Sequence, residues 1–232
     1  MIFNEKLSPE RRQFIHALFI PTLICISFIL VFIIEFGLDL DFHKAGIHPR
    51  DLNHIWGIFT YIFIHAGWGH LINNLLSFWV LVLSLYFFYK QIASKVLIFS
   101  YLISGVILWI IGRESWHIGA SGLIYAIAFF LFFSGIIRKH IPLIAISLTV
   151  TFLYGSMIWH LFPWEINDPI SWEGHLSGGI SGLVLSFLYK NAGPQKPLKV
   201  WDEEDDEIDI EDDLNYEEIN SDEENFDDKS LN

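Results

Sequence analysis

Long apolar runs separated by short polar stretches dominate the chain up to about residue 190. The apolar runs cover residues 14–36, 70–89, 96–111, 121–137, 141–162 and 174–189. A run of about 20 apolar residues is long enough to cross the hydrocarbon core of a bilayer as an α-helix. The pattern predicts an all-α polytopic membrane protein, in which residues 14–192 form a bundle of six transmembrane helices.

The stretch between the first two runs, residues 37–69, has a different character. It is rich in His and Trp, and charged residues interrupt its apolar segments. The stretch is too polar to span a membrane, but residues 55–64 are apolar enough to lie in the membrane interface. We therefore predict an interfacial first external loop.

Composition divides the chain into two physically different parts. The whole chain is 53% hydrophobic with a net charge of −13, yet residues 201–232 hold 17 of its 27 acidic residues and one of its 14 basic residues. Such a segment cannot bury enough apolar surface to offset the entropy lost on ordering. We predict that residues 193–232 are a disordered acidic tail and that residues 1–13 are a separate polar terminus.

The basic residues predict the orientation in the membrane. Six spans place both termini on one side, and most Lys and Arg of residues 1–200 fall on that side: Lys6, Arg11, Arg12, Lys90, Lys95, Arg138, Lys139, Lys190, Lys196 and Lys199. The other side has three, Lys44, Arg50 and Arg113. Because positive charge accumulates in cytoplasmic loops, we predict a multi-pass protein of the cell (inner or plasma) membrane with cytoplasmic N- and C-termini.

In this topology the second, fourth and sixth runs all begin on the outer side, and each begins with polar residues. His70 and Asn74 share one helix face, Ser121 opens the fourth run, and His175 lies near the start of the sixth. An ionisable group at mid-depth costs roughly 2.5 to 3.5 kcal/mol on insertion scales and tends to mark function. Four polar groups at one depth, two of them ionisable histidines, predict a site just below the outer surface.

Ser121 lies between Gly119 and Gly122, where a polar loop becomes an apolar run. A helix that begins there directs its free N–H groups and positive dipole end at whatever reacts near the serine. This is a way to present a nucleophile, although small residues also line ordinary contacts between membrane helices.

Small residues also predict how two of the runs pack. Gly178 and Gly182 form a G-x-x-x-G spacing after His175, and Gly122 and Ala126 offer a matching small face. Such faces let two membrane helices approach closely. Packed together, they would bring His175 next to Ser121.

Three motifs over about residues 56–189 resemble those of the rhomboid intramembrane serine proteases. The stretch from His65 to Asn74 is similar to the family's H-x-x-x-x-H-x-x-x-N. Gly119-Ala-Ser-Gly122, followed by Tyr125, is similar to its G-x-S-G segment with a later tyrosine, and residues 175–182 resemble its H-x-x-G-x-x-x-G. Two departures concern the loops: Gly57 stands where some members have arginine, and Ile118 where some have glycine.

The resemblance implies a role for each matching residue. Ser121 would be the nucleophile and His175 its general base, while His70 and Asn74 would hydrogen-bond the oxyanion. The supporting residues would be Tyr125 against the His175 ring, His65 in the first external loop, and Gly119, Gly122, Gly178 and Gly182 in the helix contacts. No metal and no cofactor would take part.

The function so implied is that of an endopeptidase that cleaves transmembrane helices near their outer end. Its partners would be single-span membrane proteins and the lipid bilayer, with no nucleic acid, and the sequence leaves the oligomeric state open. The main alternative is an inactive rhomboid-like protein that binds membrane proteins without cutting them.

Other chemistries fit the sequence less well. A transporter or proton relay would place acids deep in a span, and Glu35 lies at a span end. A metalloprotease would show H-E-x-x-H, which the sequence lacks. Leu123 occupies the last position of the G-x-S-x-G elbow of α/β-hydrolases.

Overall fold

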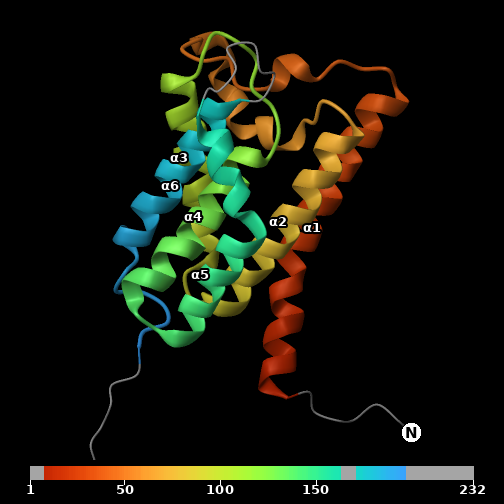
Figure 1. The fold of residues 1–232 in the computed structure, drawn as a ribbon. Helices are drawn as coiled ribbons and strands as arrows, with labels where there is room; N and C mark the ends of the chain where they lie inside the picture. Colours follow the sequence, from red (N-terminus) through yellow and green to blue (C-terminus); the bar gives the residue numbers. More distant parts are fainter. Residues whose placement is uncertain (1–7, 163–170, 197–232) are drawn as a thin grey trace, which may run out of the picture. The chain divides into compact units, whose positions relative to one another are not determined.

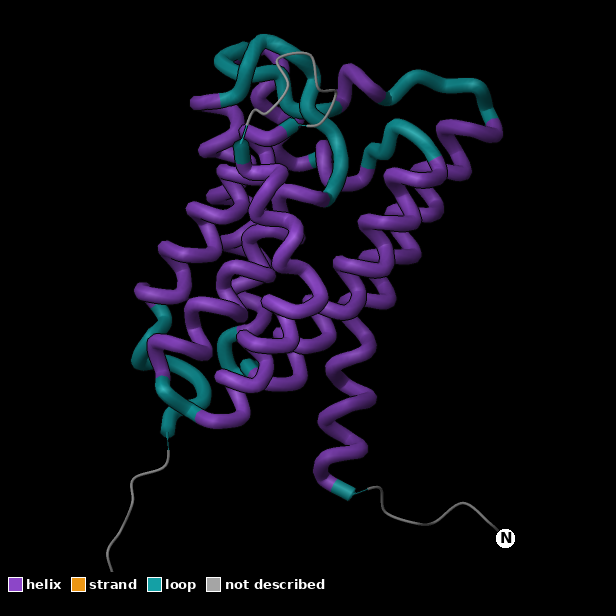
Figure 2. Tube along the Cα trace, in the orientation of Figure 1, coloured by secondary structure: helices purple, strands orange, loops and turns teal. Residues whose placement is uncertain are grey.

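The computed structural model describes residues 8–162 and 171–196, and these residues form a bundle of helices (Figures 1 and 2). Its α-helices are α1 (Pro9–Gly37), α2 (Trp68–Phe88), α3 (Ala93–Ile111), α4 (Ser121–Arg138), α5 (Ile141–Tyr154) and α6 (Trp172–Leu188). Its 3₁₀ helices are η1 (His43–Ala45), η2 (Leu52–Phe59), η3 (Tyr61–Phe63) and η4 (Gly155–Leu161). The all-helical class predicted from the hydropathy pattern is confirmed for these residues.

In the part of the chain that the structure describes, four helices, α1 to α4, are long and apolar enough to cross a membrane. Helix α6 has 17 residues and α5 has 14. At 1.5 Å per residue α5 is about 21 Å long, less than the hydrocarbon core of about 30 Å. The seven residues of η4 follow it directly and add about 14 Å at 2 Å per residue. The chain is therefore a multi-pass membrane protein, while the count of six spans remains a prediction.

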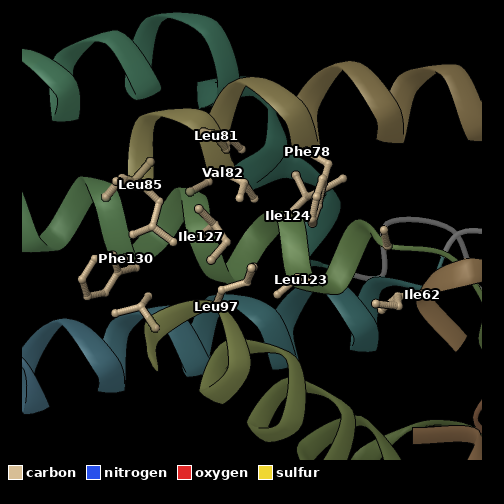
Figure 3. Packing of buried hydrophobic residues seen from close by; sticks show 14 of the residues in the cluster. Ile62, Phe78, Leu81, Val82, Leu85, Leu97, Leu123, Ile124, Ile127 and Phe130 are labelled. Atoms are coloured by element: carbon tan, nitrogen blue, oxygen red, sulfur yellow. The ribbon is translucent and has the colours of Figure 1, made fainter. Parts of the chain in front are cut away.

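Helix α4 is the central element of the bundle (Figure 1). It packs against α2, α3, α5 and, most extensively, α6. Two thirds of its apolar span (67%) is buried inside the protein, against 28–33% for α1, α2 and α3. Figure 3 shows Leu123, Ile124 and Ile127 of α4 within the buried cluster, with Val82 and Leu85 of α2 facing them. The helix that begins at Ser121 is thus the most enclosed of the four.

An arginine anchors residues 38–67, the segment predicted as the first external loop and named so below, to the bundle. The Arg50 side chain donates to the backbone oxygens of Ile110 and Gly112, at 3.1 and 2.7 Å, and its backbone N–H donates to the oxygen of Trp109. Gly57 has no room for a side chain because a Cβ there would lie 2.1 Å from the carbonyl oxygen of Gly46. The arginine that anchors this loop is therefore at position 50, and position 57 cannot supply one.

Parts of the predicted organisation lie outside the described residues. These are residues 1–7, residues 163–170 in the loop before α6, and residues 197–232 of the predicted acidic tail. The division into a polar terminus, a membrane domain and a tail stays a prediction.

Candidate active site

Ser121 is the first residue of α4, directly after a backbone turn that favours glycine. Gly119 has a φ of +102°, in a region that residues with a Cβ rarely adopt. No side chain caps the start of α4, where Ala120 holds the N-cap position. The backbone N–H groups in the first turn of α4 therefore have no side-chain capping partner at the end of the helix where Ser121 lies.

Two side chains of α2 lie against the turn that precedes Ser121. A Cβ on Gly119 would be 2.6 Å from Cε1 of His70 and 3.5 Å from Nδ2 of Asn74. Position 119 thus has neither a suitable φ nor room for a larger residue. The structure brings His70 and Asn74 to the same end of α4 as Ser121, which is the juxtaposition that the topology predicts.

Both of these α2 side chains present N–H donors. The backbone N–H of Ala66 donates to Nδ1 of His70 at 3.4 Å, so in the neutral ring the proton is on Nε2. Nδ2 of Asn74 is buried and has no hydrogen-bond partner among the described residues. A buried donor without an acceptor is costly, and an oxyanion beside Gly119 would supply that acceptor.

Backbone-to-backbone contacts between α4 and α6 occur at the predicted small residues. A Cβ on Gly178 would lie 2.0 Å from the Gly122 oxygen, and one on Gly182 would lie 2.1 Å from the Ala126 oxygen. A Cβ on Gly122 would in turn lie 3.0 Å from the oxygen of Gly174. The predicted packing of the two small faces is confirmed, so the first turns of α4 and α6 lie against each other.

The ring of His175 is held from two directions. It stacks on Tyr125 with centroids 4.2 Å apart and planes 6° from parallel. Its Nδ1 lies 3.0 Å from the carbonyl oxygen of His160 in η4. Because a carbonyl only accepts, Nδ1 carries the proton in the neutral ring and Nε2 is the basic nitrogen.

The His160 carbonyl is a feature of the site that the motifs do not include. In a Ser-His-Asp triad a carboxylate bonds to the corresponding ring nitrogen. A backbone carbonyl belongs to every residue, so the side-chain pattern of the sequence gives no signal for it. Only the path of the chain through η4 places it beside His175.

His65 is buried behind His70 at the end of the first external loop. Its ring is 3% exposed and lies 5.2 Å from the His70 ring and 5.5 Å from the Phe28 ring, measured between centroids. Burial, together with the nearby His70, lowers the pKa of His65 to about 4. A neutral His65 thus packs the loop against α1 and α2.

A small cavity adjoins the serine. Its walls include Ser121, Gly119, His117 and Ser171. Among the described residues there is no group of three or more His, Cys, Asp or Glu side chains arranged to hold a metal ion.

A family model described as the Rhomboid domain matches residues 52–192. This range covers more than half of the chain and includes α2 to α6.

Similar curated proteins come from bacteria and a mammal. An uncharacterized protein of Mycobacterium tuberculosis is 33% identical over 153 residues, or 62% of each chain. Rhomboid-related protein 2 of Mus musculus is 27% identical over 149 residues, which are 60% of this chain and 49% of that protein. Rhomboid protease GlpG of Salmonella paratyphi A is 26% identical over 144 residues, 58% of this chain and 48% of that protein. In each case the matched region is less than two thirds of the relative's length.

Proposed function

Because the chain belongs to the rhomboid family, we propose that it is an intramembrane serine endopeptidase with a Ser121–His175 dyad. The observation that supports this proposal most directly is that two contacts fix the orientation of the His175 ring. Stacking on Tyr125 and the hydrogen bond to the His160 carbonyl leave Nε2 as the basic nitrogen. The ring belongs to the helix turn that packs against the turn containing Ser121.

The reaction is acyl transfer to the serine followed by hydrolysis. Oγ of Ser121 attacks the carbonyl carbon of the scissile peptide bond while Nε2 of His175 takes its proton, and the imidazolium then returns that proton to the leaving amine. Water, activated by the same nitrogen, cleaves the acyl-enzyme ester and regenerates Ser121.

The oxyanion of each tetrahedral intermediate needs donors that are already in place. Nε2–H of His70, Nδ2–H of Asn74 and the backbone N–H of Ser121 are the donors that we assign to it. The contacts of His70 and Asn74 with Gly119 support this assignment. Nδ2 of Asn74, which has no hydrogen-bond partner among the described residues, supports the assignment as well, because the oxyanion would supply its acceptor.

The substrates that fit this site are single-span membrane proteins. A transmembrane helix hides its carbonyls in hydrogen bonds, so cleavage requires a locally unwound segment, for which small residues near the outer end of the helix are suited. The site lies at the end of the bundle where α2, α4 and α6 begin, which the distribution of basic residues predicts to be the outer side.

The experiment is cleavage of a single-span substrate with small residues near its outer end, by purified protein in liposomes. We expect one product pair, with the cut mapped by mass spectrometry within the outer part of the helix, and no product from Ser121→Ala or His175→Ala. A cut in a cytosolic loop would contradict the substrate assignment. Wild-type protein that binds the substrate and leaves it intact would favour the inactive rhomboid-like alternative.

A further inference from the structure

His117 is buried in the loop that leads to Ser121 and makes hydrogen bonds with both ring nitrogens. Its ring is 3% exposed. Nδ1 lies 2.7 Å from Oγ of Ser171, and Nε2 lies 3.1 Å from the carbonyl oxygen of Arg113. The backbone of His117 also pairs with Ile47 of the first external loop in an antiparallel bridge. His117 thus joins three separate segments of the chain.

The two partners of the ring determine its tautomer. The Arg113 carbonyl can only accept, so Nε2 carries the proton. Nδ1 of the neutral ring is then an acceptor, and the Ser171 hydroxyl donates to it. Oγ of Ser171 in turn accepts from the backbone N–H of Gly174 at 3.1 Å, as the N-cap of α6. With a neutral His117 ring, each of these polar atoms therefore has a hydrogen-bond partner.

This chain of hydrogen bonds links the start of α4, where Ser121 lies, to the start of α6, where His175 lies. His117 precedes Ser121 by four residues, and Ser171 precedes His175 by four. His117 and Ser171 also line the cavity that adjoins Ser121. The Ser171–His117 bond is thus a direct polar connection between the loop before α4 and the N-cap of α6, in addition to the glycine contacts farther along.

The charged and titratable groups around His117 come from three elements. Arg113 lies on its own loop, Glu173 on α6, and His48 on the first external loop. Glu173 is 2% exposed, accepts from the backbone N–H of Arg113 at 3.3 Å, and lies 3.6 Å from Nε of Arg113. Burial, the largest influence, lowers the pKa of His117; the hydrogen bond to the Arg113 carbonyl and the charge of Glu173 oppose this, while the charges of Arg113 and His48 act with burial. The neutral tautomer is thus the form that this environment favours.

We propose that neutral His117 is a positioning residue of the dyad, which holds the N-cap of α6, and with it His175, in register with the loop that presents Ser121. This inference rests on the proposed protease function. His117 acts through Ser171 and the two helix starts, so its effect is on the geometry of the proton transfer and falls on kcat more than on KM.

Three substitutions at Ser171 separate the effect of its O–H donor on His117 from the effect of its role as the N-cap of α6. Ser171→Thr keeps both the cap and the O–H donor. Ser171→Asp keeps an acceptor for the Gly174 N–H but removes the donor, so the neutral ring can no longer bond both the residue at position 171 and Arg113. Ser171→Ala removes both. We expect kcat near the wild-type value for Ser171→Thr and the lowest kcat for Ser171→Ala.

The pH profile of Ser171→Asp distinguishes a positioning role from a purely structural one. A protonated His117 can donate to the aspartate and to Arg113 together, so the connection survives only while the ring is charged. We expect kcat of Ser171→Asp to fall by about tenfold or more on the alkaline side, given that a misplacement of about 1 Å can cost 10²-fold. Ser171→Thr should lack this descending limb.

A pair of substitutions at His117 provides an independent test. His117→Asn retains an acceptor near the position of Nδ1 and should restore most of the kcat that His117→Leu loses, with KM changed little in either. Thermal unfolding in the same detergent controls for folding. The series at Ser171, which leaves the buried ring in place, tests the proposal even if His117→Leu does not fold.

The outcomes separate this inference from the function on which it rests. Equal pH profiles for Ser171→Asp and Ser171→Thr, beside an active wild type, would overturn the positioning role alone. Wild-type protein that cleaves no substrate would overturn the protease function and this role together. A fall in the kcat of Ser171→Asp at alkaline pH, with thermal unfolding unchanged, would support both the positioning role and the protease function.

Discussion

The rings of Tyr125 and His175 are stacked almost in parallel, with their centroids 4.2 Å apart. Tyr125 lies one helix turn after Ser121 on α4, so the helix that presents the proposed nucleophile also supports the proposed base. The second restraint on His175, from the His160 carbonyl, fixes which nitrogen is protonated. Under the proposed function these contacts would fix the orientation and tautomer of His175, which is one of the two roles of the buried aspartate in a Ser-His-Asp triad.

Removal of the Tyr125 ring should release His175 from its stacked position. We expect Tyr125→Ala to lower kcat by up to about 10²-fold, the scale that a misplacement of about 1 Å produces. Tyr125→Phe keeps a ring for the stack and should retain most of the activity. The measurement is steady-state cleavage with thermal unfolding in parallel, and equal kcat values for the Ala and Phe variants would rule out the supporting role.

A methyl group at Gly178 should separate α4 from α6. Its Cβ would meet the Gly122 oxygen at 2.0 Å, and overpacking of this kind costs about 1 to 3 kcal/mol. We expect Gly178→Ala to unfold at a lower temperature in detergent and to lose activity. Gly179→Ala, on the same helix, is the matched control because its Cβ would meet the Phe129 ring at 3.2 Å, and a side chain can move more readily than backbone. Equal destabilisation by the two variants would contradict the account of the contact.

Loss of the Asn74 donor should affect the transition state more than substrate binding. We expect Asn74→Ala to lower kcat by about 10²- to 10³-fold, as loss of one oxyanion donor does in other hydrolases, with little change in KM. Asn74→Asp, which offers only acceptors when ionised, should be at least as inactive. A variant whose KM rises while kcat is retained would place Asn74 in substrate binding instead.

The buried histidines should make the folded state sensitive to acid. The pKa of His65 falls from 6.5 to about 4 on folding, so between these values the unfolded chain binds more protons than the folded one. Its contribution to stability is complete above about pH 6.5 and is lost as the pH falls toward 4. His117, whose pKa is also lowered, acts in the same direction.

The measurement for this prediction is thermal unfolding between about pH 7.5 and about pH 4.5, which covers most of the range in which the unfolded chain protonates His65 and the folded chain does not. We expect a steady decline in the unfolding temperature, and a shallower decline in His65→Phe. Exposed His16 supplies the control, because His16→Phe should leave the slope as it is in the wild type. A slope that does not change in His65→Phe would show that other groups cause the acid sensitivity.

The sequence predicts the helices and the glycine contacts well because both follow from short-range patterns. Apolar runs form helices in a bilayer. The G-x-x-x-G spacing of Gly178 and Gly182 lets α6 pack closely against the small face of Gly122 and Ala126. The fifth run is the partial exception. Its α-helix ends at Tyr154, and Gly155–Leu161 continues as a 3₁₀ helix. The sequence marks this change only by Gly155, the C-cap residue, and glycine is also common inside membrane helices.

The features that the sequence does not predict depend on backbone groups and on loops. Arg50 anchors the first external loop through carbonyls of α3 and the residue that follows it, and the His160 carbonyl orients His175. Any residue can supply a carbonyl, so no side-chain motif marks these positions. The Ser171–His117 bond likewise joins residues that are 54 apart in the sequence, and becomes visible only when both loops are placed.

The most direct test of the central claim is covalent labelling of the purified protein with a fluorophosphonate, followed by peptide mass spectrometry. We predict a single adduct on Ser121, none on Ser121→Ala, and labelling slowed by about 10²-fold or more in His175→Ala, the scale of a lost general base. Labelling of Ser121 that proceeds equally fast without His175, or an adduct on another residue that persists in Ser121→Ala, would contradict the dyad.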